Sequence, residues 1–172
     1  REGQPTGQFL MLGSASLELL KQSSESLAGR IAFKELSVLN VSEMPPDEHT
    51  KLWLRGGFPD SLLSKSDASS MRWRVNFITT YLEREVPIFG PRIPAVTLRR
   101  LWTMLAHNQG EQVNYSKLAV SLDVSIHTIK RYIELLEDLL LLRTLRPWSG
   151  NIKKRLVKSP KIYIRDSGLT HA

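Results

Sequence analysis

The stretch Asn114-Tyr-Ser-Lys-Leu-Ala-Val-Ser-Leu-Asp-Val-Ser-Ile-His-Thr-Ile-Lys-Arg-Tyr-Ile133 decides the fold of the second half of the chain. Its pattern predicts two short helices joined by a tight turn, the arrangement called helix-turn-helix. We expect Ser116 to cap the first helix and Ser125 the second, because serine hydroxyls accept hydrogen bonds from the free amides at a helix start. Asp123 falls in the turn, where φ is positive, and aspartate tolerates that conformation better than most residues.

The second of these helices is predicted to have a buried face and an exposed face. Ile129, Ile133 and Leu136 are spaced by four and three residues, which places them on the side of the helix that faces the core. Polar side chains at the start of the helix then lie where a recognition helix reaches bases and phosphates. These candidate DNA-binding residues are Ser125, His127, Thr128, Lys130 and Arg131, with His127 and Thr128 nearest the bases.

The residues after the helix pair predict a basic hairpin. We expect residues 134–142 to continue the helix, and residues 143–145 and 161–164 to form two strands joined by a loop. Together with the helix pair, this pattern is typical of a winged helix-turn-helix, which can serve DNA contact or, alternatively, packing and docking against protein. The candidate phosphate-contacting residues in the loop are Lys153, Lys154 and Arg155.

The charge distribution favours a polyanionic partner for this half. The chain has 24 Lys and Arg against 17 Asp and Glu, a net charge of +7. Residues 1–86 hold 10 basic and 11 acidic residues, whereas residues 87–172 hold 14 basic and 6 acidic ones. Residues 143–165 hold 8 basic residues and no acidic one. Such a field favours nucleic acid, and a merely solvated basic surface is the alternative.

Several classes of protein are excluded by what the sequence lacks. It has no cysteine, so it can hold neither a disulfide framework nor a cysteine zinc site. No apolar run approaches the roughly 18 residues of a membrane span, and the N-terminus lacks the layout of a signal peptide. The four histidines are scattered, without the spacing of a metal-binding pair. A cytoplasmic protein with no membrane span and no metal site is therefore expected.

The first half predicts a mixed unit of strands and helices. Residues 8–12 and 31–36 are predicted strands. A helix is expected after Met44-Pro-Pro-Asp47, ended by Gly56-Gly57-Phe58-Pro59, and a second helix over residues 70–86 with its aromatic side chains in the core. Because two strands alone form only a marginal sheet, we expect this unit to be incomplete and the chain to be a piece of a longer protein.

The order of these segments resembles one group of bacterial and archaeal AAA+ ATPases. In that group an ATPase core is followed by a winged helix and a C-terminal domain of unknown function, often nuclease-like. The matching stretches follow the family's order over nearly the whole chain. They are Leu12-Gly-Ser-Ala-Ser16, Ser26-Leu-Ala-Gly-Arg30, Leu54-Arg-Gly-Gly-Phe-Pro59, Thr80-Tyr-Leu-Glu-Arg84, Leu135-Leu-Glu-Asp-Leu139 and Lys158-Ser-Pro-Lys-Ile-Tyr-Ile-Arg-Asp-Ser-Gly-Leu169.

The resemblance implies a mostly α fold with short β-strands (α+β), divided into three segments. Residues 1–86 would be the end of the ATPase core and its helical lid, residues 87–165 the winged helix-turn-helix, and residues 166–172 the start of a truncated C-terminal domain. It also implies that Ser14 is a sensor residue for the γ-phosphate and that Arg30 stabilises charge during phosphoryl transfer.

The same resemblance implies that the complete protein binds ATP and Mg²⁺. This chain contains no Gly-x-x-x-x-Gly-Lys-Ser/Thr string, so we expect it to bind no cofactor and to be inactive alone. Its expected partners are DNA, the upstream ATPase core and a second copy in a homo-oligomer. The alternative is a non-enzymatic interaction module whose winged helix docks on the ATPase core or on a partner subunit.

Asp166 resembles the first acid of the nuclease-like domain. No Glu-x-Lys partner follows it in this sequence. We therefore expect Asp166 to start a helix and not to bind a metal.

Overall fold

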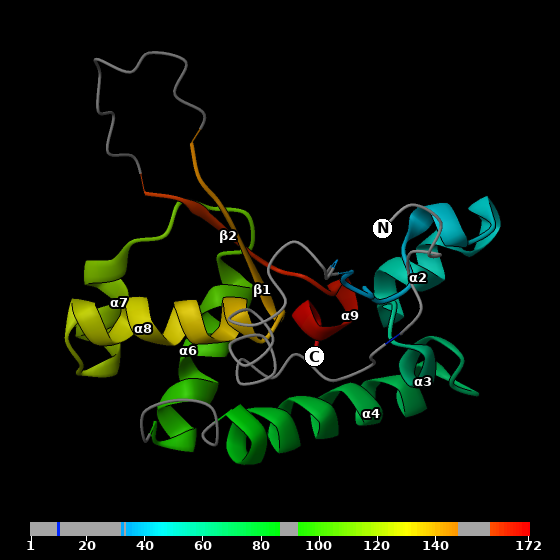
Figure 1. Ribbon diagram of the computed structural model, residues 1–172. Coiled ribbons are helices and arrows are strands. Elements are labelled where there is room, and N and C mark those ends of the chain that lie inside the picture. Colours follow the sequence, from blue (N-terminus) through cyan, green and yellow to red (C-terminus); the bar gives the residue numbers. More distant parts are fainter. Residues whose placement is uncertain (1–9, 11–31, 33, 87–92, 148–158) are drawn as a thin grey trace.

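The computed structural model describes residues 10, 32, 34–86, 93–147 and 159–172, which Figure 1 draws as coloured ribbons. This part of the chain is mostly helical with one small antiparallel sheet of two strands, which confirms the α+β class. In chain order, the elements are α2 (His49–Arg55), α3 (Pro59–Leu62), α4 (Asp67–Thr80), α6 (Ala95–His107), α7 (Tyr115–Leu122), α8 (Ile126–Asp138), β1 (Leu142–Leu145), β2 (Lys161–Ile164) and α9 (Ser167–Thr170).

The expected helix after the Pro-Pro pair is confirmed as α2. A 3-10 turn over Pro46–Glu48 leads into it, and Leu52 is its buried side chain. The helix ends where Gly56 adopts a φ of 77°, a conformation that glycine reaches without the steric cost of a Cβ. Pro59 then opens α3 at the first helical position, where the missing amide proton costs nothing.

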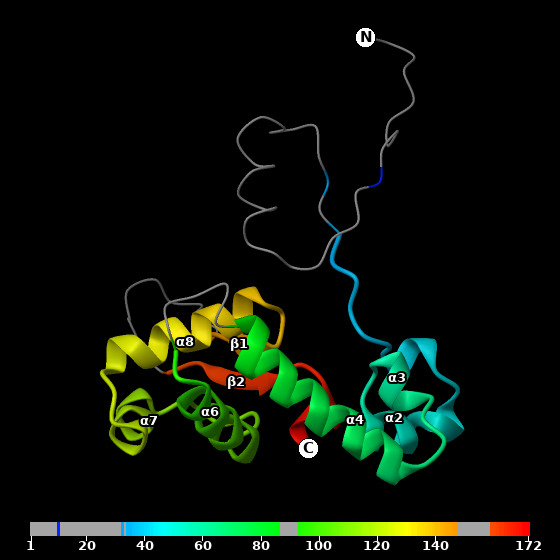
Figure 2. The same cartoon turned by 90° about the horizontal axis from the view of Figure 1, so that it is seen from below.

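The long helix α4 begins earlier than the aromatic spacing predicted. It starts at Asp67 instead of residue 70, because the hydroxyl of Ser66 accepts a hydrogen bond from the amide of Ser69 at 3.2 Å and so caps the helix. A wider π turn, Tyr81–Glu85, continues it. Figures 1 and 2 show α4 running from the α2–α3 pair towards α6, so it connects the two halves of the described chain.

The aromatic side chains on α4 form a row of rings. Trp73 and Phe77 stack with 5.2 Å between ring centroids, and Phe77 and Tyr81 stack at 5.3 Å. Phe58 lies against the same row, 4.9 Å from Phe77. All four rings are half-buried, so they lie at the border of the hydrophobic core and not fully inside it.

The second half is built around one contiguous hydrophobic cluster. On α6 Leu98, Leu101, Trp102 and Leu105 recur at spacings of three and four, and all four are buried. The two strands occur where they were predicted, and β1 starts one residue earlier. In the sheet Leu142 pairs with Ile164 and Leu145 with Lys161.

Two predictions of secondary structure are wrong. No strand forms in the described residues of the range 31–36; Leu36 there is almost fully exposed and is paired with no strand of the described chain. The helix over residues 134–142 stops at Asp138, because Leu140 takes a φ of 60° and the chain reverses. The reversal lets Leu141 and Leu142 enter the core.

The C-terminal turn of the chain packs against the first helices through buried polar groups. Asp166 begins α9, as expected, with its Oδ1 accepting from the Leu169 amide at 2.8 Å. Its Oδ2 accepts from the Gly57 amide at 2.7 Å, across 109 residues of sequence. Figure 1 shows α9 between β2 and α2. One carboxylate thus joins the end of the hairpin to the loop after α2.

Arg74 completes this contact from α4. The side chain is 2% exposed, and its Nη1 donates to the carbonyl oxygen of Gly168 at 2.7 Å and to that of Leu54 at 3.0 Å. A Cβ on Gly168 would lie 2.2 Å from the Arg55 carbonyl oxygen, so only glycine fits there. We refer to the group of Gly56, Gly57, Arg74, Asp166 and Gly168 as the buried junction.

Candidate nucleic-acid interface

The turn between α7 and α8 has the conformation that the sequence predicted. Asp123 is left-handed, with φ 53° and ψ 48°, and the amide of Val124 donates to the Ala119 carbonyl at 3.1 Å. Ser125 caps α8 as expected, its hydroxyl accepting from the amide of Thr128 at 3.0 Å. The capping interaction fixes where the first turn of α8 presents its side chains.

The predicted cap of α7 is wrong by two residues. The side-chain oxygen of Asn114, and not that of Ser116, accepts from the Lys117 amide at 2.9 Å. Asparagine is as good an N-cap as serine, and its position here lets the helix begin at Tyr115. Ser116 therefore lies inside the first turn of α7, where its side chain is exposed.

The two faces of α8 differ as predicted. Ile129, Ile133 and Leu136 are buried in the core, which confirms their inward orientation. On the opposite side His127, Lys130 and Arg131 are exposed. We call the surface formed by the described DNA-binding candidates and Ser116 the α7–α8 face. It comprises Ser116, Ser125, His127, Thr128, Lys130 and Arg131.

Thr128 differs from the other candidates on this face. It is half-buried, and its hydroxyl lies 2.8 Å from the hydroxyl of Ser125. The two hydroxyls bond to each other at the helix start, so their first role is to hold the helix in place. His127, which follows Ile126 in the exposed first turn, is the more accessible of the two residues expected nearest the bases.

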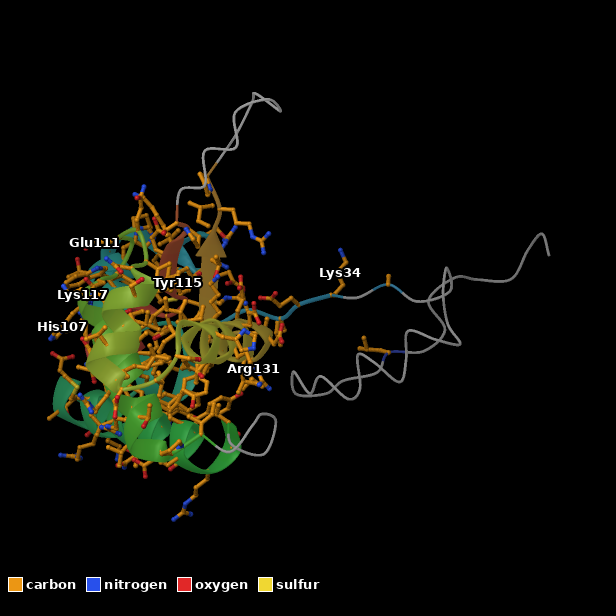
Figure 3. All side chains as sticks on the ribbon, turned by 90° about the vertical axis from the view of Figure 1, so that its left-hand side faces the viewer. Lys34, His107, Glu111, Tyr115, Lys117 and Arg131 are labelled. Carbon is orange, nitrogen blue, oxygen red and sulfur yellow. The ribbon has the colours of Figure 1, made fainter. Side chains whose placement is uncertain are left out.

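Lys130 lies over an aromatic ring that sequence reasoning did not select. Its ammonium nitrogen is 5.5 Å from the centroid of the Tyr115 ring, within the range of a cation–π interaction. Figure 3 shows Tyr115 between Lys117 and Arg131 in a view onto this side of the molecule. The two partners are 15 positions apart on different helices, so no local sequence pattern indicates their contact.

Two hollows meet on the α7–α8 face. A polar hollow of about 450 Å³ lies between the start of α7, Lys130 of α8 and Ser159, two residues before β2. A second hollow, about 620 Å³, lies over the turn. They share Ser116 and Ile126. The first is lined by Gln112, Val113, Asn114, Tyr115, Ser116, Ile126, Lys130 and Ser159.

The surroundings of Tyr115 further stabilise the neutral form of its phenol. Burial raises the pKa of its phenol, and the carboxylates of Glu134 and Glu137 raise it further, while Arg146 acts in the opposite direction. The phenol therefore keeps its proton near neutral pH and can donate a hydrogen bond. The influence of Arg146 also shows that the end of the hairpin's first strand brings positive charge to this side.

The hairpin is attached to the start of α7. The amide of Gly110 donates to the Ile162 carbonyl at 2.9 Å, and that of Val113 donates to the Pro160 carbonyl at 2.9 Å. Arg143 and Lys161 are exposed on the strands. These bonds place the basic strands beside the polar hollow.

Several predicted residues lie outside the described part of the chain. They are Ser14, Arg30, Lys153, Lys154 and Arg155. Within the described residues, no group of three or more histidine, aspartate or glutamate side chains has the arrangement of a metal site. In the same residues, no helix has the length and apolar character needed to cross a membrane.

Comparisons with known proteins give a family and two relatives. A family model described as a domain of unknown function (DUF8612) matches residues 46–172. Uncharacterized proteins of Mycobacterium bovis and Mycobacterium tuberculosis are each 51% identical over 164 residues, which cover 95% of this chain. The chain spans 37% of the length of these relatives. No solved structure matches it.

Proposed function

The chain belongs to the DUF8612 family of domains of unknown function, and we propose that its residues 87–165 are a winged helix-turn-helix that binds duplex DNA. The observation that carries the proposal is the start of α8. There a capped helix with a buried apolar face presents an imidazole and two cations to solvent. Sequence-reading helices place such side chains at their N-terminal end, in the major groove.

The charges on the α7–α8 face support a contact with phosphates. Lys130 and Arg131 lie side by side in sequence on the exposed part of α8, and Lys117 is exposed on α7. Asp123 and Glu134 are also exposed nearby, so the face as a whole is only mildly basic. Positioned cations, more than a large net charge, are therefore the basis of the proposed binding.

The hairpin supports the same proposal as a wing. Arg143, Arg146 and Lys161 are exposed on or beside its strands. Basic side chains on a wing contact the sugar-phosphate backbone, which gives affinity without sequence preference. The loop residues Lys153, Lys154 and Arg155 would extend that contact.

The resemblance to AAA+ ATPases supports a wider proposal for the complete protein. It would bind ATP and Mg²⁺ in a core that precedes this chain, with Ser14 and Arg30 in sensor roles. Residues 1–86 would form the end of that core and its lid. Nucleotide state would then be coupled to DNA engagement by the winged helix, in a monomer or a homo-oligomer.

A second function, docking on protein, is favoured by exposed apolar side chains on α7, α8 and β1. Val120 is 83% exposed on α7, and Ile126 is 44% exposed at the start of α8. Leu145 on β1 is 51% exposed. A surface of this kind fits a non-enzymatic module that packs on the ATPase core or on a partner subunit.

Fluorescence anisotropy with duplex DNA over a salt series tests the first function against the second. We expect micromolar binding at low salt with a steep fall as salt rises, because phosphate contacts release counterions. The variant Lys153→Ala/Lys154→Ala/Arg155→Ala should flatten that fall. An absence of binding at low salt would contradict DNA binding and leave docking as the function to pursue.

A further inference from the structure

The polar hollow beside α7 has the chemistry of an anion site. Its polar lining comes from three separate parts of the chain: Gln112, Asn114 and Ser116 at the start of α7, Lys130 on α8, and Ser159 before β2. The cap of α7 uses only the side-chain oxygen of Asn114, so its amide NH₂ group can donate elsewhere. Hydroxyl, amide and ammonium donors thus converge on one small volume.

Lys130 supplies the positive charge of this hollow. Its side chain points to the hollow although a carboxylate on its own helix is within reach. Glu134 lies four residues later on the same helix face, where a carboxylate commonly attracts a lysine. Among the described residues, however, the ion pairs do not include Lys130. Its ammonium lies over the Tyr115 ring at the edge of the hollow.

Tyr115 can hold the lysine there because its ring is itself fixed. The side chain is half-buried and packs against the hydrophobic core. It is the first residue of α7, whose start is capped by Asn114. Because the Tyr115 ring is already held in place, it loses little conformational entropy when the lysine ammonium binds to its face. A flexible glutamate side chain would lose more on forming an ion pair with the lysine.

We propose that Tyr115 is a positioning residue that holds Lys130 at the polar hollow, where the lysine binds a phosphate of the DNA backbone. The inference rests on the proposed function, because it assigns one phosphate contact of the same DNA-binding face. The ring acts through the lysine, and the hydroxyl of Ser116 lies where it can donate to the same phosphate. Arg131, one residue further on, contacts the DNA independently of Tyr115.

A double-mutant cycle tests whether Tyr115 acts through Lys130. The probe is a mixed-sequence DNA duplex of about 20 base pairs, since phosphate contacts do not depend on sequence. Tyr115→Leu should weaken binding about two- to fivefold in the wild-type background, the range of an exposed cation–π contact. In the Lys130→Gln background the same change should have no effect. An equal loss in both backgrounds would overturn the inference.

A ring series tests the same point without altering the packing. Tyr115→Phe should bind nearly as well as wild type, and replacement of Tyr115 by increasingly fluorinated phenylalanines should weaken binding stepwise, because fluorine removes the negative face of the ring. Ring variants that all bind alike would overturn the proposal, even if Tyr115→Leu fails to fold.

The outcomes separate this inference from the proposed function. Lys130→Gln should reduce the slope of log affinity against log salt by about 1. If Lys130→Gln leaves the slope unchanged while Arg131→Gln lowers it, the phosphate site is wrong and DNA binding by α8 stands. If wild type does not bind the duplex at all, the proposed function itself fails.

Discussion

The buried junction and the α7–α8 face use charged side chains in opposite ways. In the junction Arg74 and Asp166 are 2% and 5% exposed, and each forms hydrogen bonds with backbone groups both nearby in sequence and on distant segments. On the α7–α8 face Lys130 and Arg131 are exposed, and the ring of Tyr115 is the contact found for Lys130. The buried charges of the junction therefore maintain the fold, whereas the exposed charges of α8 are available to a ligand.

The largest effect is expected from removing the junction's arginine. Arg74→Met should lower the free energy of unfolding by about 3–5 kcal/mol, because it leaves Asp166 and two carbonyl groups buried without their cation. Arg72→Met, an exposed neighbour on the same helix, is the matched control and should change it by less than about 0.5 kcal/mol. Equal effects in urea unfolding would show that the junction does not carry the stability assigned to it.

The second largest loss of stability is expected from a steric clash at Gly168. Gly168→Ala should cost about 3 kcal/mol, because the new Cβ would lie 2.2 Å from the Arg55 carbonyl oxygen. Gly110→Ala provides a control with a positive φ of 76° but a nearest contact of 3.1 Å, to a side-chain carbon of Tyr163. Gly110→Ala should lower the free energy of unfolding by about 1 kcal/mol. Thermal unfolding of the two variants measures the difference, and a larger loss at Gly110 would contradict the close approach of α9 to α2.

The protonation of Asp166 gives the junction a pH dependence. Burial raises the pKa of its carboxyl group, against the opposing effects of the backbone amides of Gly57 and Leu169 and the charge of Arg74. With a raised folded pKa, its contribution to stability is full below the ordinary carboxyl range and falls as pH rises through the folded pKa. The stability advantage of wild type over Asp166→Asn should therefore shrink as the pH rises from below the ordinary carboxyl range through the folded pKa. An advantage that grows with pH would show that the hydrogen bonds outweigh burial.

A smaller effect is expected at the start of α8. Ser125→Ala removes the cap and the bond to Thr128, and should lower stability by about 1 kcal/mol. Ser121→Ala, at an exposed serine within α7, is the control and should have little effect. Circular-dichroism melts compare the two. If Ser121→Ala lowered the stability and Ser125→Ala did not, α8 would not depend on its cap.

The contrast between the two regions also explains what could be predicted from sequence. Local signals succeeded: the spacing of Ile129 and Ile133, the left-handed turn at Asp123 and the Ser125 cap all follow from residues within one or two turns. The error at Ser116 arose because Asn114, an equally good capping residue, lies two residues earlier. At the end of α8 the run of leucines has no local stop signal, and the reversal follows from tertiary packing.

Contacts between distant segments could not be predicted. Arg74 and Gly168 are 94 residues apart, and nothing near either residue indicates the other. The same holds for Lys130 and Tyr115, whose contact depends on the crossing of α7 and α8. For the candidate site, the sequence therefore predicted which side chains of α8 are exposed, and the structure added the ring and the hollow beside them.

A comparison of two charge-removing variants tests whether the exposed cations of α8 contact DNA phosphates. The slope of log affinity against log salt is measured for wild type, Arg131→Gln and the control Arg72→Gln, which removes an equal charge on the distant helix α4. We expect the slope to fall by about 1 for Arg131→Gln and to stay unchanged for Arg72→Gln. Identical slopes for the two variants would contradict these phosphate contacts, because binding would then depend only on net charge.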